Sequence, residues 1–339
     1  MKQMARIRLT SASLGMLLMI LDSKTAVAAA REGLELCIRT VIPSLFPFFV
    51  ISSWMLPLLL GSRNPLLRPI GRITRIPEGA ESLLLVGFLG GYPTGAACVA
   101  EAFRSGRLPR QAAERMMVFC SNAGPSFLFG IVGGLFPQSW IVWLLWAIQI
   151  VTSLVCGILL PGGPGGHCIA AKETHSSLPA ALTQAIRSMV LVCGWVILFR
   201  VMLGFGDRWL FWLLPPEWSV LVSGVLELTN GCCSLPGICG VGSRFVMASL
   251  LLSFGGLCVA MQTASVTDGL SFRLYLPGKL LQCALSLILS LGVQWILPEG
   301  IKLSPVIFLT LTATVIGLYF LLSPAKKEKS SSIPGALGV

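Results

Sequence analysis

Long apolar runs with almost no charge dominate the chain. Four of them are about 17 to 22 residues long, close to the roughly 20 residues that a helix needs to cross a bilayer. They lie at 44–60, 139–160, 278–297 and 303–323. Barrel strands alternate between polar and apolar residues in short segments, whereas these runs are apolar on every face. The pattern therefore predicts an all-α polytopic membrane protein that contacts the lipid bilayer.

Composition strengthens this interpretation, because 55% of the 339 residues are hydrophobic and only 12% are charged. The net charge of +11 does not require a nucleic-acid partner, since the cations lie in short loops and in the tail, as in cytoplasmic segments of membrane proteins. Asp22 and Lys24 stand where a cleavage site has small residues, so the first helix is expected to be a retained anchor. Both ends are cationic, which predicts two cytoplasmic termini and an even number of spans.

Four interruptions fall inside apolar segments and not between them. They are Gly90–Gly95, Cys120–Pro125, Glu227–Gly231 and Ser253–Leu257. Glycine and proline disrupt the helix, and backbone groups freed at membrane depth must be buried in protein or line a polar cavity. A single break is better explained as a kink or a close helix contact. Four breaks in two pairs instead predict a polar site near the middle of the membrane.

The breaks also indicate an internal repeat. Aligning 87–94 with 224–231 places the first break over the third, and the second then falls near the fourth. The predicted organisation is a first membrane repeat, a link rich in proline and glycine, a second membrane repeat and a basic cytoplasmic tail: 1–160, 161–180, 181–323 and 324–339.

Arginines on both sides of 82–103 suggest how the first break is oriented. Both flanking segments can be cytoplasmic only if 82–103 enters and leaves on one side, as a re-entrant hairpin that turns at 90–95. Each limb rises about 12 Å, enough to reach midway through a hydrocarbon core of roughly 30 Å. The matching loops of the second half hold only Arg208 and Arg244, an asymmetry that is typical of inverted repeats.

Glu227 is the leading candidate site residue, because it lies in an apolar stretch where an ionisable group is costly unless it is paired, hydrated or protonated. The alternative is a structural ion pair between Glu227 and Arg200. Thr229 and Asn230 follow on a segment that we expect to be unwound, where they can offer a hydroxyl and a carboxamide to a polar solute. The polar residues at the breaks of the first half are Tyr92, Thr94, Ser121 and Asn122.

Other chemistry is not indicated. His167 and His175 lie in the polar link, away from other metal ligands. Cys232, Cys233 and Cys239 lie close to one another but have no His or Asp nearby, so no metal site is predicted. Most of the 11 cysteines lie in apolar runs, where they serve as small packing residues, and no disulfide is predicted. No phosphate-binding loop, zinc-protease motif or nucleophile elbow occurs, so neither an enzyme nor a cofactor is expected.

Three motifs carry a resemblance to a known family. They are G-F-L-G-G-Y-P-T-G-A from Gly87, F-R-S-G-R-L-P-R-Q-A-A-E-R from Phe103 and F-C-S-N-A-G-P-S-F-L-F-G from Phe119. The chain resembles the nucleoside-recognition, or Gate-domain, membrane proteins, and among them the YlbJ-type sporulation integral membrane proteins. The resemblance is specific over 35–137 and looser through the second half, where E-L-T-N-G at 227–231 is similar to the partner repeat.

This resemblance implies a multi-pass protein of the bacterial inner membrane with a role in spore cortex formation or maturation. It also implies kinship to concentrative nucleoside transporters and to the membrane part of ferrous-iron transporters. The motif residues that match are Gly91, Tyr92, Pro93, Thr94, Gly95, Ser121, Asn122, Gly124 and Pro125. A shared fold does not fix a substrate, so nucleoside transport does not follow.

Two hypotheses of function result. The first is a transporter-like protein that handles a small polar solute during sporulation. The second is a non-transporting scaffold that recruits envelope or sporulation partners, which predicts that polar groups at the breaks satisfy one another and leave no cavity. A second copy of the chain and other sporulation membrane proteins are further candidate partners.

Overall fold

The computed structural model describes residues 2–59, 65–162 and 177–293. These residues form helices and turns without a β-strand, which confirms the all-α prediction. The predicted span at 303–323, the tail at 324–339 and most of the link lie outside the described residues.

Five segments of the described chain are long and apolar enough to cross a membrane, as a polytopic membrane protein requires. They are Ser23–Met55, Trp140–Leu159, Leu178–Trp209, Val241–Val266 and Phe272–Val293. The predicted run at 139–160 coincides with one of them, whereas the run at 44–60 is the second half of a longer helix that begins at Ser23. The run at 278–297 belongs to a helix that begins earlier in the chain, and its last residues lie outside the description.

The first half contains the helices α1 to α9, with one π-helical and one 3-10 turn. Their bounds are α1 Lys2–Leu21, α2 Ser23–Leu36, η1 Cys37–Val41, α3 Ile42–Leu59, α4 Arg68–Ile73, α5 Ser82–Gly90, α6 Thr94–Arg104, α7 Arg110–Phe119, α8 Pro125–Gly130, η2 Val132–Leu135 and α9 Trp140–Leu159. The second half has α10 Leu178–Trp209, η3 Phe211–Leu213, α11 Pro216–Leu226, α12 Leu228–Cys233, η4 Leu235–Gly237, α13 Val241–Phe254, α14 Gly256–Val266, η5 Phe272–Leu274 and α15 Tyr275–Val293.

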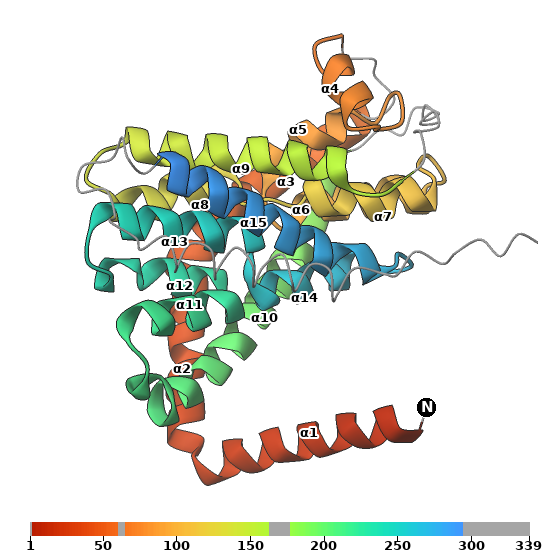
Figure 1. Ribbon diagram of the computed structural model, residues 1–339. Coiled ribbons are helices and arrows are strands. Elements are labelled where there is room, and N and C mark those ends of the chain that lie inside the picture. Colours follow the sequence, from red (N-terminus) through yellow and green to blue (C-terminus); the bar gives the residue numbers. More distant parts are fainter. Residues whose placement is uncertain (1, 60–64, 163–176, 294–339) are drawn as a thin grey trace, which may run out of the picture.

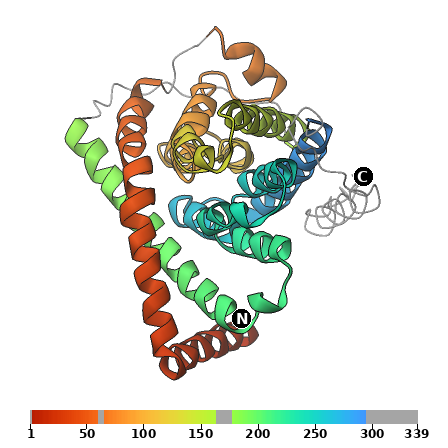
Figure 2. The same ribbon diagram turned by 90° about the vertical axis from the view of Figure 1, so that its left-hand side faces the viewer.

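One long helix from each half packs against the other along one side of the molecule (Figure 2). These are the continuous helix α2–η1–α3 and the helix α10. Small residues allow the close crossing: a Cβ on Gly33 would lie 3.0 Å from the Cα of Ile197, and one on Gly204 would lie 2.6 Å from the Cβ of Ala29. Small residues at a helix crossing let backbones approach closely, as is usual in membranes.

The arginine-rich segments lie together at one end of the molecule (Figure 1). Hydrogen bonds join them to the helix ends there. Arg115 donates to the carbonyl of Arg75 at 3.3 Å and to that of Leu160, at the end of α9, at 3.4 Å. Arg104 donates to the carbonyl of Val266, at the end of α14, at 3.2 Å. The segments on both sides of α5–α6 therefore share one end of the fold, which we call the arginine end.

Most exposed tryptophans of the described chain lie away from the arginine end; the exception is Trp54, near the end of α3. The others occur at the start of α9, at the end of α10, in η3 and at the start of α11: Trp140, Trp143, Trp209, Trp212 and Trp218. Tryptophan is enriched where a membrane protein crosses the interface between lipid and water. Most of the exposed tryptophans thus lie at the end of these helices that is opposite the arginine end.

Candidate functional site

The four predicted interruptions are all present. Helices α5 and α6 are separated by residues 91–93, and α7 and α8 by 120–124. Helices α11 and α12 are separated by Glu227 alone, and α13 and α14 by Gly255 alone. The second half is therefore interrupted over fewer residues than the sequence suggested.

The breaks of each half contact each other through glycines. Gly91 has a φ of 75°, and a Cβ on it would lie only 2.7 Å from the backbone nitrogen of Gly124. The first break therefore packs directly against the second. A Cβ on Gly256 would lie 2.9 Å from the carbonyl oxygen of Gly224 and 3.3 Å from the nitrogen of Leu228. The fourth break therefore packs against the third in the same way.

Tyr92 joins the two halves. Its hydroxyl donates to the carbonyl of Leu252 at 3.0 Å, and its ring lies against Gly255, whose added Cβ would be 3.0 Å from the tyrosine oxygen. Gly255 has a φ of 83°, which favours glycine. The first break therefore contacts the fourth, and all four breaks meet at one place, which we call the junction.

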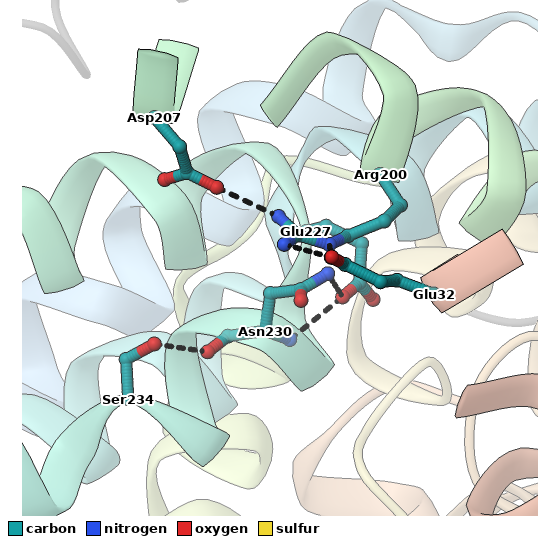
Figure 3. Close-up of polar contacts among 6 residues, drawn as sticks. All are labelled: Glu32, Arg200, Asp207, Glu227, Asn230 and Ser234. Carbon is teal, nitrogen blue, oxygen red and sulfur yellow. Dashed lines mark hydrogen bonds and ion pairs between the residues drawn. The ribbon is translucent and has the colours of Figure 1, made fainter. Parts of the chain in front are cut away.

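Glu227 lies at the junction and is 2% exposed. Its carboxylate accepts a hydrogen bond from the backbone nitrogen of Thr229 at 3.0 Å. It also accepts from the backbone nitrogen of Asn230 at 2.7 Å and from the Asn230 carboxamide at 2.9 Å (Figure 3). It is therefore the N-cap of α12, and its charge faces the positive end of that helix. The expectation that Thr229 and Asn230 are unwound was wrong, because capping by Glu227 lets the helix restart at Leu228.

Arg200 does not pair with Glu227, as the ion-pair alternative required, but with two other carboxylates. Arg200 bonds Glu32 of α2, with its Nε at 3.0 Å from that carboxylate, and Asp207 of α10 at 2.9 Å (Figure 3). Among the residues described, no ion pair joins Arg200 to Glu227. Two half-exposed carboxylates satisfy the guanidinium where α2 crosses α10, so the buried Glu227 is held by helix capping and not by a cation.

A small cavity of about 40 Å³ opens beside Glu227. It has room for roughly three water molecules. Residues of the junction line one side of it, and residues of the long helix pair line the other. The predicted site residues in the lining are Tyr92, Gly124, Glu227 and Thr229. On the facing side it meets Val41 and Ser44, next to the π-helical turn, a distortion that often accompanies functional sites.

A second, larger cavity of about 290 Å³ lies between α3, α6 and α10, and we call it the vestibule. Pro93 and Thr94 of the first break line it, and so do Glu101 and Arg104 toward the arginine end. Its wall on α10 includes Ser188, one helical turn before Val192, which lines the small cavity. The two cavities therefore follow each other along the seam between the long helix pair and the broken helices.

Several predicted site residues face away from the small cavity. The Asn122 carboxamide donates to the Phe119 carbonyl at 2.7 Å and to the Ser153 hydroxyl at 3.2 Å. The Ser121 carbonyl accepts from the amine of Lys279. Gly95 is packed tightly, because its added Cβ would meet the Cys120 carbonyl oxygen. These residues shape the breaks and do not line the space beside Glu227.

Lys279 was missed from the sequence, although the rule that singled out Glu227 applies to it as well. It lies within the apolar run at 278–297, and in the structure it is 1% exposed. An ionisable residue inside a spanning helix is itself a signal of function. Gln262, which lines the small cavity from α14, carries no such signal, because a neutral amide in a helix has many other roles.

The described residues contain no group of three or more His, Cys, Asp or Glu side chains that could together hold a metal ion. The arrangement instead offers a carboxylate, a hydroxyl and an amide to a small polar ligand at a meeting point of broken helices. The fold is that of a polytopic α-helical membrane protein, and the junction is its candidate site.

Comparison with known proteins gives the chain a relative. It is 26% identical over 304 residues to the sporulation integral membrane protein YlbJ of Bacillus subtilis (strain 168), covering 75% of this chain and 74% of the relative. This similarity confirms the predicted resemblance to the YlbJ-type proteins. No family model matches the chain. No solved structure matches it either.

Proposed function

We propose that this protein is a transporter-like protein of the bacterial inner membrane that binds a small polar solute at the junction and acts in sporulation. The observation that carries the proposal is the meeting of four helix breaks around a buried carboxylate beside a cavity. In membrane transporters built from inverted repeats, discontinuous helices form the substrate site near the bilayer midplane. The role in sporulation rests on the similarity to YlbJ.

Matching contacts in the two halves support the inverted repeat and the Gate-type fold. A Cβ on Gly95 would lie 2.8 Å from the Cα of Gly87, and one on Gly231 would lie 2.2 Å from that of Gly224. The α5–α6 and α11–α12 hairpins thus close on glycine pairs, and Gly87 and Gly224 are the residues that the repeat alignment equates. In this arrangement α5–α6 re-enters from the arginine end, which we propose is cytoplasmic, as are both termini.

Glu227 favours a solute that carries a positive charge or donates a hydrogen bond. A carboxylate has about four acceptor positions, and at least three of those in Glu227 are used within the protein. A donor from a ligand would compete with the Thr229 hydroxyl for the remaining position, and Thr229 and Gln262 line the same cavity.

The cavity is too small for most solutes in this conformation, so transport requires the seam to open. The vestibule provides a route from the arginine end to Pro93 and Thr94, and the turn at Tyr92 separates it from the space beside Glu227. We infer that a solute enters by the vestibule and reaches the junction when α3 and α10 move away from the first break. The present conformation, with the seam closed, is on this proposal the occluded state of an alternating-access cycle.

The test is an uptake screen in proteoliposomes with nucleosides, amino acids, divalent cations and small carboxylates. We expect accumulation of at least one class, and a loss of about tenfold or more in Glu227→Gln, because the variant removes the charge that faces the solute. Glu35→Gln is the matched control, since Glu35 is an exposed glutamate paired with Arg39. It should transport like the wild type.

The scaffold remains the second candidate, because many polar groups around the breaks satisfy one another, as with Asn122 and Ser153. It predicts no uptake of any solute by correctly inserted protein. It also predicts normal sporulation in a Glu227→Gln strain with normal protein levels. That pair of results would replace the transport proposal.

A further inference from the structure

Lys279 places a positive charge beside the second break. It lies in α15, inside the candidate span Phe272–Val293, and is 1% exposed. Its amine donates to the carbonyl of Ser121 and to the Gln282 carboxamide oxygen at 2.9 Å. The amine also lies 5.2 Å from the centre of the Tyr92 ring. Among the residues described, no carboxylate pairs with it.

These contacts are those of a site for a small monovalent cation. The Ser121 carbonyl follows the end of α7, where unpaired carbonyls create a negative helix terminus. An aromatic face attracts a cation that has lost its water. In transporters with broken helices, unwound carbonyls and half-helix ends of this kind coordinate the coupling cation. All the partners of Lys279 are neutral, which suits one positive charge and not two.

The ligands of the amine are held in place by a further hydrogen-bond network. Gln282 donates through its nitrogen to the Asn122 carboxamide oxygen at 2.9 Å, so its oxygen is turned toward Lys279. Asn122 is fixed in turn by the Phe119 carbonyl and by Ser153. The site is therefore preorganised by three helices, α7, α9 and α15, and does not depend on the flexible lysine side chain for its shape.

We propose that the Lys279 amine, in its protonated form, occupies a monovalent-cation site at the second break, so that the protein supplies this cation from its own side chain and needs no dissolved Na⁺ or K⁺ there. The inference concerns the second break and stands whether or not the junction transports a solute. Removing the amine while leaving its space open should convert the position into a site for a free cation.

The experiment compares the thermal unfolding of purified full-length protein in detergent, in chloride salts of choline, Na⁺, K⁺ and methylammonium at equal ionic strength. The wild type should have the same midpoint in all four salts. Lys279→Ala should unfold at a lower temperature in choline, which is too large for the site. It should regain about 4 °C or more in saturating small cation, as expected for a ligand that binds only the folded state.

Lys279→Met is the matched control, because it removes the charge but fills the space. It should lose stability and show no difference between the salts. Equal midpoints of Lys279→Ala in every salt would overturn the proposal, and so would an equal response of Lys279→Met. Lys279→Ser replaces the alanine variant if that variant does not accumulate. A wild type stabilised by Na⁺, with no added response in the variant, would also contradict the proposal.

Discussion

Replacing Glu227 by glutamine tests how this buried carboxylate is held. The two carboxylate oxygens accept from the backbone of Thr229, from the backbone of Asn230 and from the Asn230 carboxamide. Glutamine has one acceptor oxygen, and its amide nitrogen cannot accept. At least one buried donor at the start of α12 therefore loses its partner in Glu227→Gln.

The expected cost follows from these bonds. A buried donor left without an acceptor costs about 1–3 kcal/mol, and hydrogen bonds to a charged group that become neutral lose roughly 1 kcal/mol. We therefore expect Glu227→Gln to lower the free energy of unfolding by about 2–4 kcal/mol. Breaking a buried ion pair costs about 3–5 kcal/mol, which overlaps this range, so the single variant does not distinguish the two explanations.

A double-mutant cycle with Arg200→Gln does distinguish them. Arg200 bonds Glu32 and Asp207, so its removal should leave the effect of Glu227→Gln unchanged, with a coupling energy below about 0.5 kcal/mol. The assay is reversible unfolding in mixed micelles, followed by tryptophan fluorescence. The cycle of Arg200→Gln with Glu32→Gln is the positive control, and a coupling of about 0.5–1 kcal/mol is expected for this partly exposed pair. Rescue of Glu227→Gln by Arg200→Gln by more than about 1 kcal/mol would refute the capping role.

Three further predictions follow from the packing and the topology. Gly95→Ala should destabilise the protein by about 3 kcal/mol or prevent its accumulation, because the new Cβ would lie 1.9 Å from the Cys120 carbonyl oxygen. Gly130→Ala, which meets nothing within 4 Å, should accumulate normally on an immunoblot, and equal levels of the two variants would contradict the tight closure of the hairpin. A cysteine at the exposed Ser105 should react with an impermeant thiol reagent only from the cytoplasm, whereas the exposed Cys239 should react only from the opposite side. Labelling of both from one side would rule out the proposed topology. Reporter tags on the two termini should both be cytoplasmic, and tags on opposite sides would mean an odd number of spans.

The sequence by itself determined the class of the protein and the places where its helices are interrupted. Apolar runs of membrane length require helices, because backbone groups in lipid must be satisfied within their own segment. Glycine, proline and a lone acidic residue then stand out against that background, and this is why Gly91, Gly255 and Glu227 could be located without a structure. The alignment of 87–94 with 224–231 equated Gly87 with Gly224, and in the structure Gly87 lies against Gly95 and Gly224 against Gly231.

Only the tertiary structure decided which polar groups meet. The sequence offered Arg200 as a partner for Glu227, but hydrogen bonding depends on which helix faces are opposed, and α2 brings Glu32 to Arg200 instead. Lys279 is far from the breaks along the chain, and only the packing of α15 against the end of α7 gives it the Ser121 carbonyl. Local sequence sets where a helix stops, because that depends on nearby residues. Long-range packing decides which other helices a given helix contacts. Two helices cross closely only where small residues such as Gly33 and Gly204 let their backbones approach.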